Sequence, residues 1–311
     1  MAKRFWQTLW FKLAAGFLLL ALAVGLGAGA YMKYRYFPQV SYDTVPPELP
    51  AFQGGPRVLV FSKTNGYRHL EAIPADVRQR AKLLVLNYPN SPTGKVATRE
   101  FYEQVIEFAQ TNQIVVVQDA AHILLTFSGQ PFSFLSVPGA REVGVEVHSL
   151  SKGFNMIGWR LGWVCGHERI VQALADVKDN SDSGQFIAIQ KAAVTALDDD
   201  SIPVQIREKY RRRMAKLVQA LTRCGFVCRM PGGSYFLYTR SPRGLADGPA
   251  FDTAEAASQY LITRHSIVTV PWDDAGPFLR FSVTYEAADE AAEDALMAET
   301  VKRLTGIRLV F

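Results

Sequence analysis

Residues 149–163 read Ser149-Leu-Ser-Lys-Gly-Phe-Asn-Met-Ile-Gly-Trp-Arg-Leu-Gly-Trp163, and they indicate more about fold and function than any other stretch. An apolar segment at residues 143–147 comes just before them and predicts a buried strand. The stretch then places two hydroxyls around Lys152, with a guanidinium eight residues after the lysine. Its glycines permit tight backbone turns. We therefore expect a strand that ends in a loop carrying reactive side chains.

These side chains suit a cofactor that has both an aldehyde and a phosphate. The amine of Lys152 can form a Schiff base with pyridoxal 5′-phosphate. Ser149 and Arg160 supply a hydroxyl donor and a planar cation, both of which bind phosphate oxygens. The alternative interpretation of Lys152 is a solvated surface lysine.

Strand and helix patterns alternate around this stretch. Apolar segments at residues 82–86 and 114–117 predict buried strands, and residues 98–111 between them have the pattern of a helix with one apolar face. Such alternation is typical of an α/β fold, in which a mostly parallel sheet carries helices on both faces. We expect this sheet over residues 82–200, and a connecting helix with a smaller α+β domain over residues 201–311.

The connecting helix is predicted from an apolar stripe that consists of Tyr210, Met214, Leu217 and Leu221. The densest basic run of the chain, residues 207–216, lies in the same segment, so a solvated helix face explains it better than a nucleic-acid patch. The net charge of +5 is correspondingly mild. Beyond the helix, segments 226–230 and 235–239 flank Pro231-Gly-Gly-Ser234 and predict a hairpin.

The three cysteines are an odd number and lack the spacing of zinc ligands, so we expect neither a disulfide framework nor a metal site. Reduced thiols favour the cytoplasm for this part of the chain.

Several motifs occur in the order that is typical of one enzyme family. The lysine stretch, Ser91-Pro-Thr-Gly94, Asp119 and Leu279-Arg-Phe-Ser282 together resemble the motifs of class I/II aminotransferases of fold type I. The likeness covers residues 82–311 and is greatest to LL-diaminopimelate aminotransferases. It implies pyridoxal 5′-phosphate, amino-group transfer between an amino acid and a 2-oxo acid, and a role in lysine biosynthesis. It also implies a homodimer whose sites are built from both subunits.

The resemblance assigns roles to individual residues. Lys152 would be the catalytic residue that carries the cofactor and moves the substrate proton. Asp119 follows a predicted strand and would keep the ring nitrogen of the cofactor protonated, although a turn or helix-cap aspartate is the alternative. Arg280 would bind the α-carboxylate of the substrate, with a structural salt bridge as its alternative.

Two positions depart from the family pattern. Ser91 stands where the family has asparagine, and His122 stands where it has tyrosine. Both family residues donate hydrogen bonds to the phenolic oxygen of the cofactor, so we expect Ser91 and His122 to bind there with altered reach. The alternative for His122 is a packed polar residue.

The N-terminal part of the chain has a different character. Residues 13–30 are apolar without a charge and follow basic residues, which predicts a single-pass membrane helix. A cleaved leader is possible instead because Ala28-Gly-Ala30 resembles a signal-peptidase site, and a buried helix of a soluble core is a third interpretation. We therefore assign residues 1–37 to an anchor or signal segment, and the Pro- and Gly-containing residues 38–56 to a linker.

Residues 57–80, with the segments before them, resemble the start of membrane-attached ThuA-like (trehalose-utilisation) proteins. They are too few for such a domain, and the aminotransferase likeness lacks the upstream part of its large domain. A join near residue 82, by natural fusion or by faulty assembly, explains both features. The competing function is thus a membrane-tethered fusion or truncation product that retains the lysine motif with impaired or no activity. Within the enzyme class, racemisation or β-elimination are further alternatives.

Overall fold

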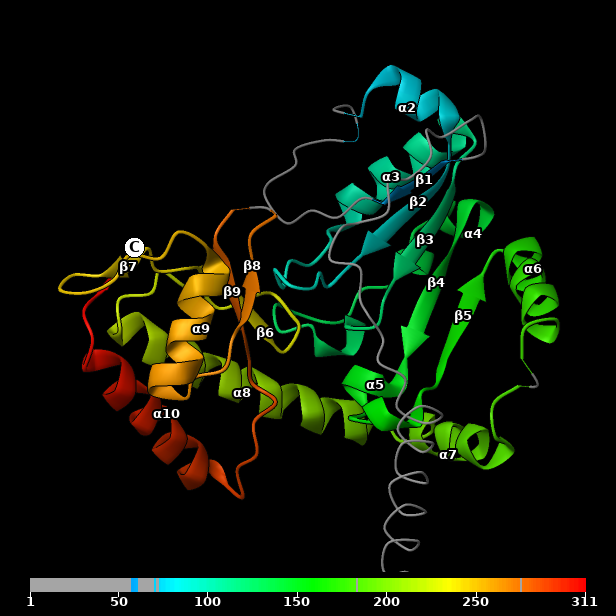
Figure 1. The fold of residues 1–311 in the computed structure, drawn as a ribbon. Helices are drawn as coiled ribbons and strands as arrows, with labels where there is room; N and C mark the ends of the chain where they lie inside the picture. The colour runs from blue at the N-terminus through cyan, green and yellow to red at the C-terminus, as the bar shows by residue number, and fades with distance from the viewer. Residues whose placement is uncertain (1–56, 61–69, 71–72, 183, 275) are drawn as a thin grey trace, which may run out of the picture. The chain divides into compact units, whose positions relative to one another are not determined.

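The computed structural model describes residues 57–60, 70, 73–182, 184–274 and 276–311. Its largest sheet has five strands in the order β1-β2-β3-β4-β5, of which the first four run parallel and the last is antiparallel (Figure 1). The strands are β1 (Arg57–Val60), β2 (Ala81–Asn87), β3 (Val115–Asp119), β4 (Gly144–Ser149) and β5 (Gly162–Gly166). The predicted mostly parallel sheet is therefore confirmed.

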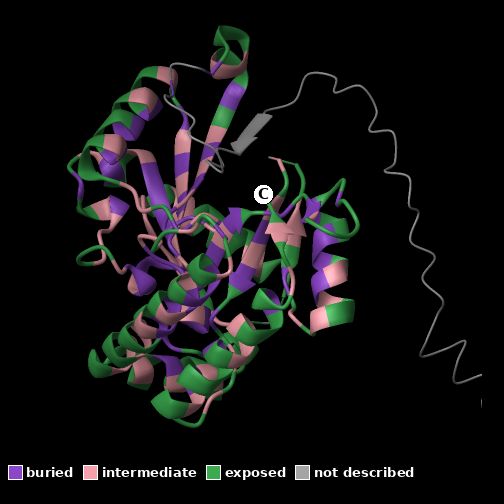
Figure 2. Ribbon diagram, turned by 90° about the vertical axis from the view of Figure 1, so that its left-hand side faces the viewer, coloured by how far each residue is buried: buried purple, intermediate pink, exposed green. Residues whose placement is uncertain are grey.

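One face of this sheet is packed tightly. Helix α3 (Arg99–Asn112) begins at Thr98, whose side chain accepts a hydrogen bond from the Phe101 amide at 3.2 Å. The helix buries an apolar stripe against the strands, made of Tyr102, Val105, Ile106 and Ala109. From β2 this face receives the fully buried Leu84 and Leu86, whereas Leu83 on the opposite face is half-buried. Figure 2 shows the buried residues gathered on the strands and on stripes of the helices, with exposed residues on the outer helix surfaces.

Shorter helices complete this part of the chain. They are α2 (Ala75–Arg80), η2 (Ile123–Leu125), η3 (Phe134–Ser136), α4 (Ala140–Val143), α5 (Leu150–Gly153), η4 (Ile157–Trp159), α6 (Glu168–Asp179) and α7 (Ile187–Leu197). Helix α6 buries no side chain, and α7 buries only Ala193 among the described residues. Helix packing in the described chain is thus dense on one face of the sheet and sparse around α6 and α7.

The C-terminal part is an α+β arrangement built on the long helix α8 (Ser201–Arg223). A three-stranded antiparallel sheet has the order β6-β9-β8, and a two-stranded sheet joins β10 to β7. The remaining elements are β6 (Phe236–Arg240), β7 (Gly244–Leu245), α9 (Ala254–His265), β8 (Val270–Trp272), β9 (Phe278–Ser282), α10 (Glu290–Thr305) and β10 (Leu309–Val310). Residues 201–311 thus combine helices with antiparallel strands, and their assignment to a separate smaller domain stays a prediction.

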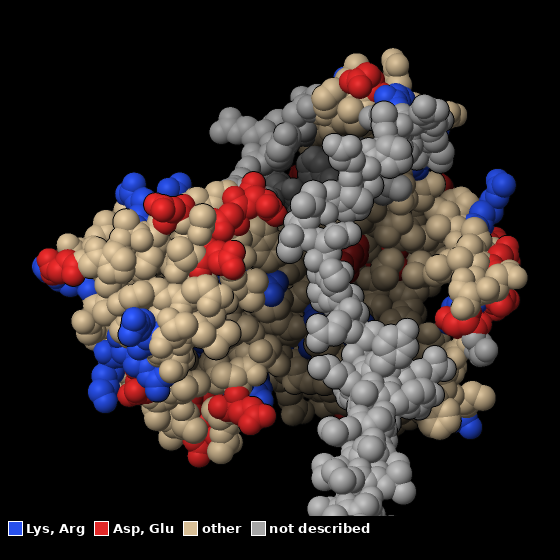
Figure 3. All heavy atoms as spheres, viewed as in Figure 1, with Lys and Arg blue, Asp and Glu red and all other residues tan. Residues whose placement is uncertain are grey.

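Helix α8 packs as its sequence pattern predicts. The four residues of the predicted stripe are all buried in the C-terminal core. The predicted hairpin around Pro231 is wrong, because residues 226–230 form no strand and β6 pairs with β9 instead. On the face shown in Figure 3, Lys and Arg side chains alternate with Asp and Glu, which fits a solvated surface.

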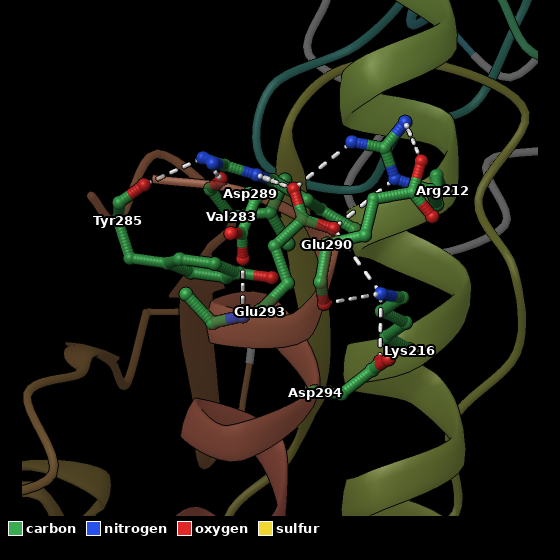
Figure 4. Close-up of polar contacts among 10 residues, drawn as sticks. Arg212, Lys216, Val283, Tyr285, Asp289, Glu290, Glu293 and Asp294 are labelled. Atoms are coloured by element: carbon green, nitrogen blue, oxygen red, sulfur yellow. Dashed lines mark hydrogen bonds and ion pairs between the residues drawn. The ribbon is translucent and has the colours of Figure 1, made fainter. Parts of the chain in front are cut away.

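A group of charges around the buried Glu293 and Arg213 joins α8, α10 and the segment that follows β9 (Figure 4). Glu293 is 1% exposed and accepts hydrogen bonds from Arg213 Nε at 2.7 Å and from Arg212 Nη2 at 3.1 Å. Lys216 Nζ lies 3.3 Å from its other oxygen. Arg213 also donates to the carbonyl oxygen of Tyr285 at 2.5 Å. The hydrogen bond from Arg212, with those from Arg213 and Lys216, lowers the pKa of Glu293 to about 2.

The segment upstream of residue 82 adds to the same sheet. Strand β1 pairs in parallel with β2, in a register that places Val58 opposite Leu83 and Val60 opposite Val85. The predicted anchor or signal segment at residues 1–37 and the linker at 38–56 lie outside the described residues. In the part of the chain that is described, no helix combines the length and the apolar character that crossing a bilayer requires. The same residues contain no cluster of three or more metal-ligand side chains.

Glu293→Gln should destabilise the protein by about 3 kcal/mol, because it leaves the buried Arg213 without its counter-charge. Urea denaturation at pH 7 measures this free energy of unfolding. Glu299→Gln is the matched control on the same helix, since its pair with Arg303 is exposed and should contribute less than about 1 kcal/mol. Equal effects of the two substitutions would contradict a special role for the buried charges.

Candidate active site

The strand ends bring the first candidate residues together. The parallel register places Asn87 opposite Asp119, and Asp119 opposite Val147, so the carboxyl ends of β2, β3 and β4 lie side by side. Ser149 is the last residue of β4. Ligand-binding groups of open α/β sheets lie at this edge.

Lys152 is held by a short helix that follows β4 directly. The Ser149 side chain caps α5 by accepting a hydrogen bond from the Ser151 amide at 3.1 Å. Helix α5 packs closely on η2 because Gly153 has no side chain, and a Cβ there would lie 2.7 Å from Leu124. The Lys152 amine is 5.4 Å from the ring centroid of Tyr235. The lysine is half-buried, which does not fit the alternative of a solvated surface residue.

His122 packs against the same tyrosine ring. It is 4% exposed, and its ring meets that of Tyr235 edge-on at 5.5 Å between centroids. Its Nδ1 is buried without a hydrogen-bond partner among the described residues. Burial, together with the positive charges of Lys152 and Arg280, lowers the pKa of His122 to about 4. His122 is therefore a neutral ring next to two cations.

Arg280 reaches the site from β9, where it stands opposite Tyr238 and Val270. Its guanidinium carbon lies 4.0 Å from the ring centroid of Phe236 and 5.5 Å from that of Trp272. Its Nε is buried without a partner in the described part of the chain. Burial also lowers the pKa of this guanidinium. No carboxylate among the described residues pairs with Arg280, so the salt-bridge alternative has no support there.

Asp119 and Ser91 have local contacts. One carboxylate oxygen of the half-buried Asp119 accepts a hydrogen bond from the Ala121 amide at 2.9 Å. This contact is typical of a turn aspartate, which is the alternative to the role beside the cofactor ring. The Ser91 amide donates to Asn87 Oδ1 at 2.8 Å. Asn90, which is 2% exposed, accepts bonds from the amide and hydroxyl of Thr93 and holds the loop together.

Ser149 and Arg160, the two residues expected to bind the phosphate, differ in their surroundings. Pairing of Ser149 with Gly162 brings the loop that contains Arg160 back to the end of β4. The Ser149 hydroxyl is 3.5 Å from the carbonyl oxygen of Leu161. Arg160 is exposed and donates to the carbonyl oxygen of Ile157 at 3.1 Å. The structure thus groups Lys152, His122 and Arg280 closely, and leaves Arg160 at the surface.

Tyr235 is a site residue that the sequence motifs did not predict. This residue is 6% exposed and is in ring contact with His122, Phe236 and Tyr210 as well as with the Lys152 amine. The available signal in the sequence was an aromatic residue directly after Pro231-Gly-Gly-Ser234, at the start of an apolar segment.

His122 Nδ1 and Arg280 Nε are buried without partners among the described residues, and the charges of Lys152 and Arg280 both act on His122. A group that offers an aldehyde for the amine and oxygens for such donors would satisfy them. The residues present therefore fit pyridoxal 5′-phosphate with a bound carboxylate.

Sequence comparison identifies the family to which this fold belongs. The family model for aminotransferases of class I and II matches residues 51–295, and the chain belongs to this family, whose members depend on pyridoxal 5′-phosphate. The chain is 52% identical over 250 residues to the LL-diaminopimelate aminotransferase of Methanocaldococcus jannaschii, which covers 78% of this chain and 60% of the relative. It is 48% identical over 257 residues to the same enzyme of Methanococcus maripaludis, with coverages of 81% and 62%.

Solved structures lead to the same fold. The substrate-bound structure of BacF from Bacillus subtilis matches with a TM-score of 0.69 at 31% identity, covering 78% of this chain and 60% of that one. An aminotransferase from Staphylococcus aureus matches with a TM-score of 0.67 at 25% identity, with coverages of 76% and 61%. The chain thus spans about 60% of the length of the curated relatives that it matches.

The matched range also bears on residues 57–80. The family match begins at residue 51 and so includes them, and their strand β1 belongs to the five-stranded sheet. Neither finding supports the ThuA-like interpretation of this segment.

The His122 ring should stay neutral from pH 5.5 to pH 8, because burial and two neighbouring cations oppose its protonation. Nitrogen chemical shifts of the histidine rings measure this, and His122→Asn identifies the signal. Since the folded pKa is below the ordinary value, His122 should lower stability as the pH falls from about 6.5 towards 4. A titration midpoint near 6.5 would contradict the observed burial.

Proposed function

We propose that this chain is a pyridoxal 5′-phosphate-dependent aminotransferase, which transfers an amino group between an amino acid and a 2-oxo acid. The observation that carries the proposal is the grouping of Lys152 and Arg280 around the buried, neutral His122. Identities of 52% and 48% to two LL-diaminopimelate aminotransferases support LL-diaminopimelate as the amino donor, and hence a role in lysine biosynthesis.

Each candidate residue has a part in holding the cofactor. Lys152 would bind its aldehyde carbon, and Asp119 would pair with its ring nitrogen. Ser149 and Arg160 would bind the phosphate, with Arg160 turning from its present contact with the Ile157 carbonyl. Ser91 and His122 would donate to the phenolic oxygen. The bound cofactor supplies an electron sink that makes the Cα bonds of the substrate easier to break.

The remaining chemistry belongs to side chains. Arg280 binds the α-carboxylate through its planar fork, and the rings of Phe236 and Trp272 limit the tilt of that fork. Lys152, once free, accepts the proton from Cα as a general base. His122 donates a hydrogen bond as a neutral ring and adds no third positive charge to the site.

Two alternatives compete with this proposal. A membrane-tethered protein that retains the lysine motif without turnover would bind no cofactor or exchange no amino group. Racemisation or β-elimination would use the same Lys152, and product analysis after a single turnover separates them from amino transfer.

The wider organisation is also a proposal. We assign residues 82–200 to the large-domain portion and 201–311 to the small domain, with a membrane anchor at 13–30 and the enzyme part in the cytoplasm. A homodimer is supported by large apolar side chains on α6 and before α7, since Val177 is 63% and Phe186 72% exposed.

Lys152→Ala should remove covalent cofactor retention and lower amino-group exchange by about 10³-fold, because both the attachment point and the base are lost. Hydride trapping followed by peptide mass analysis should find the cofactor on Lys152 in the unmodified protein. Lys191→Ala, which changes an exposed lysine of α7, is the control and should leave both readouts unchanged.

An unmodified Lys152 in folded, cofactor-saturated protein would overturn the proposed function. Cofactor bound at Lys152 without exchange would favour the inactive alternative.

A further inference from the structure

Tyr235 is the residue on which several candidate side chains converge. Its ring lies 5.4 Å from the Lys152 amine and meets His122 edge-on at 5.5 Å and 72°. On other sides it contacts Phe236 at 4.7 Å and Tyr210 at 5.4 Å. Phe236 in turn carries the Arg280 guanidinium at 4.0 Å. One buried ring therefore touches the lysine and the histidine, and its neighbour holds the arginine.

The backbone around Tyr235 is fixed from two directions. Ser234 is fully buried in a left-handed conformation, with φ of 72°, and its amide donates to the Leu125 carbonyl at 3.0 Å. The Tyr235 carbonyl accepts from the Val283 amide at 3.1 Å. His122 directly precedes η2, which contains Leu125, and Val283 follows β9, which carries Arg280. The backbone of residues 234 and 235 is therefore tied to the segments that position His122 and Arg280.

A second tyrosine connects this ring to the loop after the lysine. Tyr210 from α8 packs against Tyr235 and donates its hydroxyl hydrogen to Asn155 Oδ1 at 2.8 Å. Asn155 has φ of 53° and lies three residues after Lys152. The aromatic pair therefore restrains both the side chain of Lys152 and the loop that follows it.

An aromatic face attracts a positively charged amine, and a fixed ring limits the positions that a long, flexible lysine side chain can adopt. We propose that Tyr235 is a positioning residue, whose ring holds the Lys152 amine beside His122 before any ligand binds. Its relevance to catalysis rests on the proposed function, because that function makes Lys152 the reacting group.

The aromatic ring of Tyr235, and not its hydroxyl, positions the Lys152 amine in this proposal. No hydrogen bond of the Tyr235 hydroxyl occurs among the described residues, whereas the hydroxyl of Tyr210 has a defined partner. Tyr235→Phe therefore keeps the contact with the amine, and Tyr235→Leu removes it while remaining apolar.

The test measures acylation of Lys152 in the full chain without cofactor. Peptide mass spectrometry gives the labelling rate of Lys152 relative to the exposed Lys191 of the same molecule. With Tyr235→Leu the relative rate should rise by about threefold to tenfold, the range expected when one cation–π contact is lost. With Tyr235→Phe it should equal that of the unsubstituted protein.

Tyr238→Leu is the matched control, since it removes a ring of β6 that packs on Phe278 and Trp272 instead. It should leave the relative rate of Lys152 unchanged. Should circular dichroism show that Tyr235→Leu has unfolded, Tyr235→Met takes its place, because methionine fills the site without a ring.

An unchanged rate in the Leu or Met variant would overturn the proposal, and so would a Phe variant that labels as fast as the Leu variant. The outcome is independent of cofactor binding. Hydride trapping on the unsubstituted protein tests the proposed function separately, so failure of one inference is distinguishable from failure of the other.

Discussion

The site depends on one electrostatic constraint, which is that two half-buried positive side chains lie near the buried His122, while no acidic group pairs with Arg280 among the described residues. Lys152 and Arg280 both act on His122, and together with burial they keep its pKa near 4. The protein accommodates the arginine with the faces of Phe236 and Trp272, which attract a cation without neutralising it. Such a space favours an anionic ligand, and a carboxylate meets this need directly.

The architecture explains how distant segments supply this space. Lys152 follows β4, His122 precedes η2, and Arg280 lies on β9 far along the chain. The loop at Gly94 packs on Pro231, since a Cβ at this glycine would lie 2.5 Å from the proline side chain. The α/β part and the C-terminal part therefore meet through close backbone contacts at the same place as the functional side chains.

Local sequence patterns predicted several helices and strands well. They did not predict which strands pair when the partners are far apart in the sequence. The stripe of α8 and the strand that leads to Lys152 follow from periodicity, which is a property of neighbouring residues. The hairpin around Pro231 failed because β6 finds its partner in β9, more than 30 residues later, and no local turn signal encodes that choice. Tyr235 was missed for the same reason, since its contacts come from three separate segments. The roles of all the candidate site residues remain predictions, namely those of Lys152, Asp119, His122, Ser91, Ser149, Arg160 and Arg280.

The buried ion cluster around Glu293 gives the small domain an insensitivity to dissolved salt. Mobile ions weaken attractions between exposed groups over a screening length of about 8 Å at physiological ionic strength, and they act much less on pairs that solvent cannot reach. Exposed pairs such as Lys178 with Asp182 lose strength in concentrated electrolyte. Arg213 and Glu293 are shielded from it, so the attraction that joins α8 to α10 should weaken much less as the salt concentration rises.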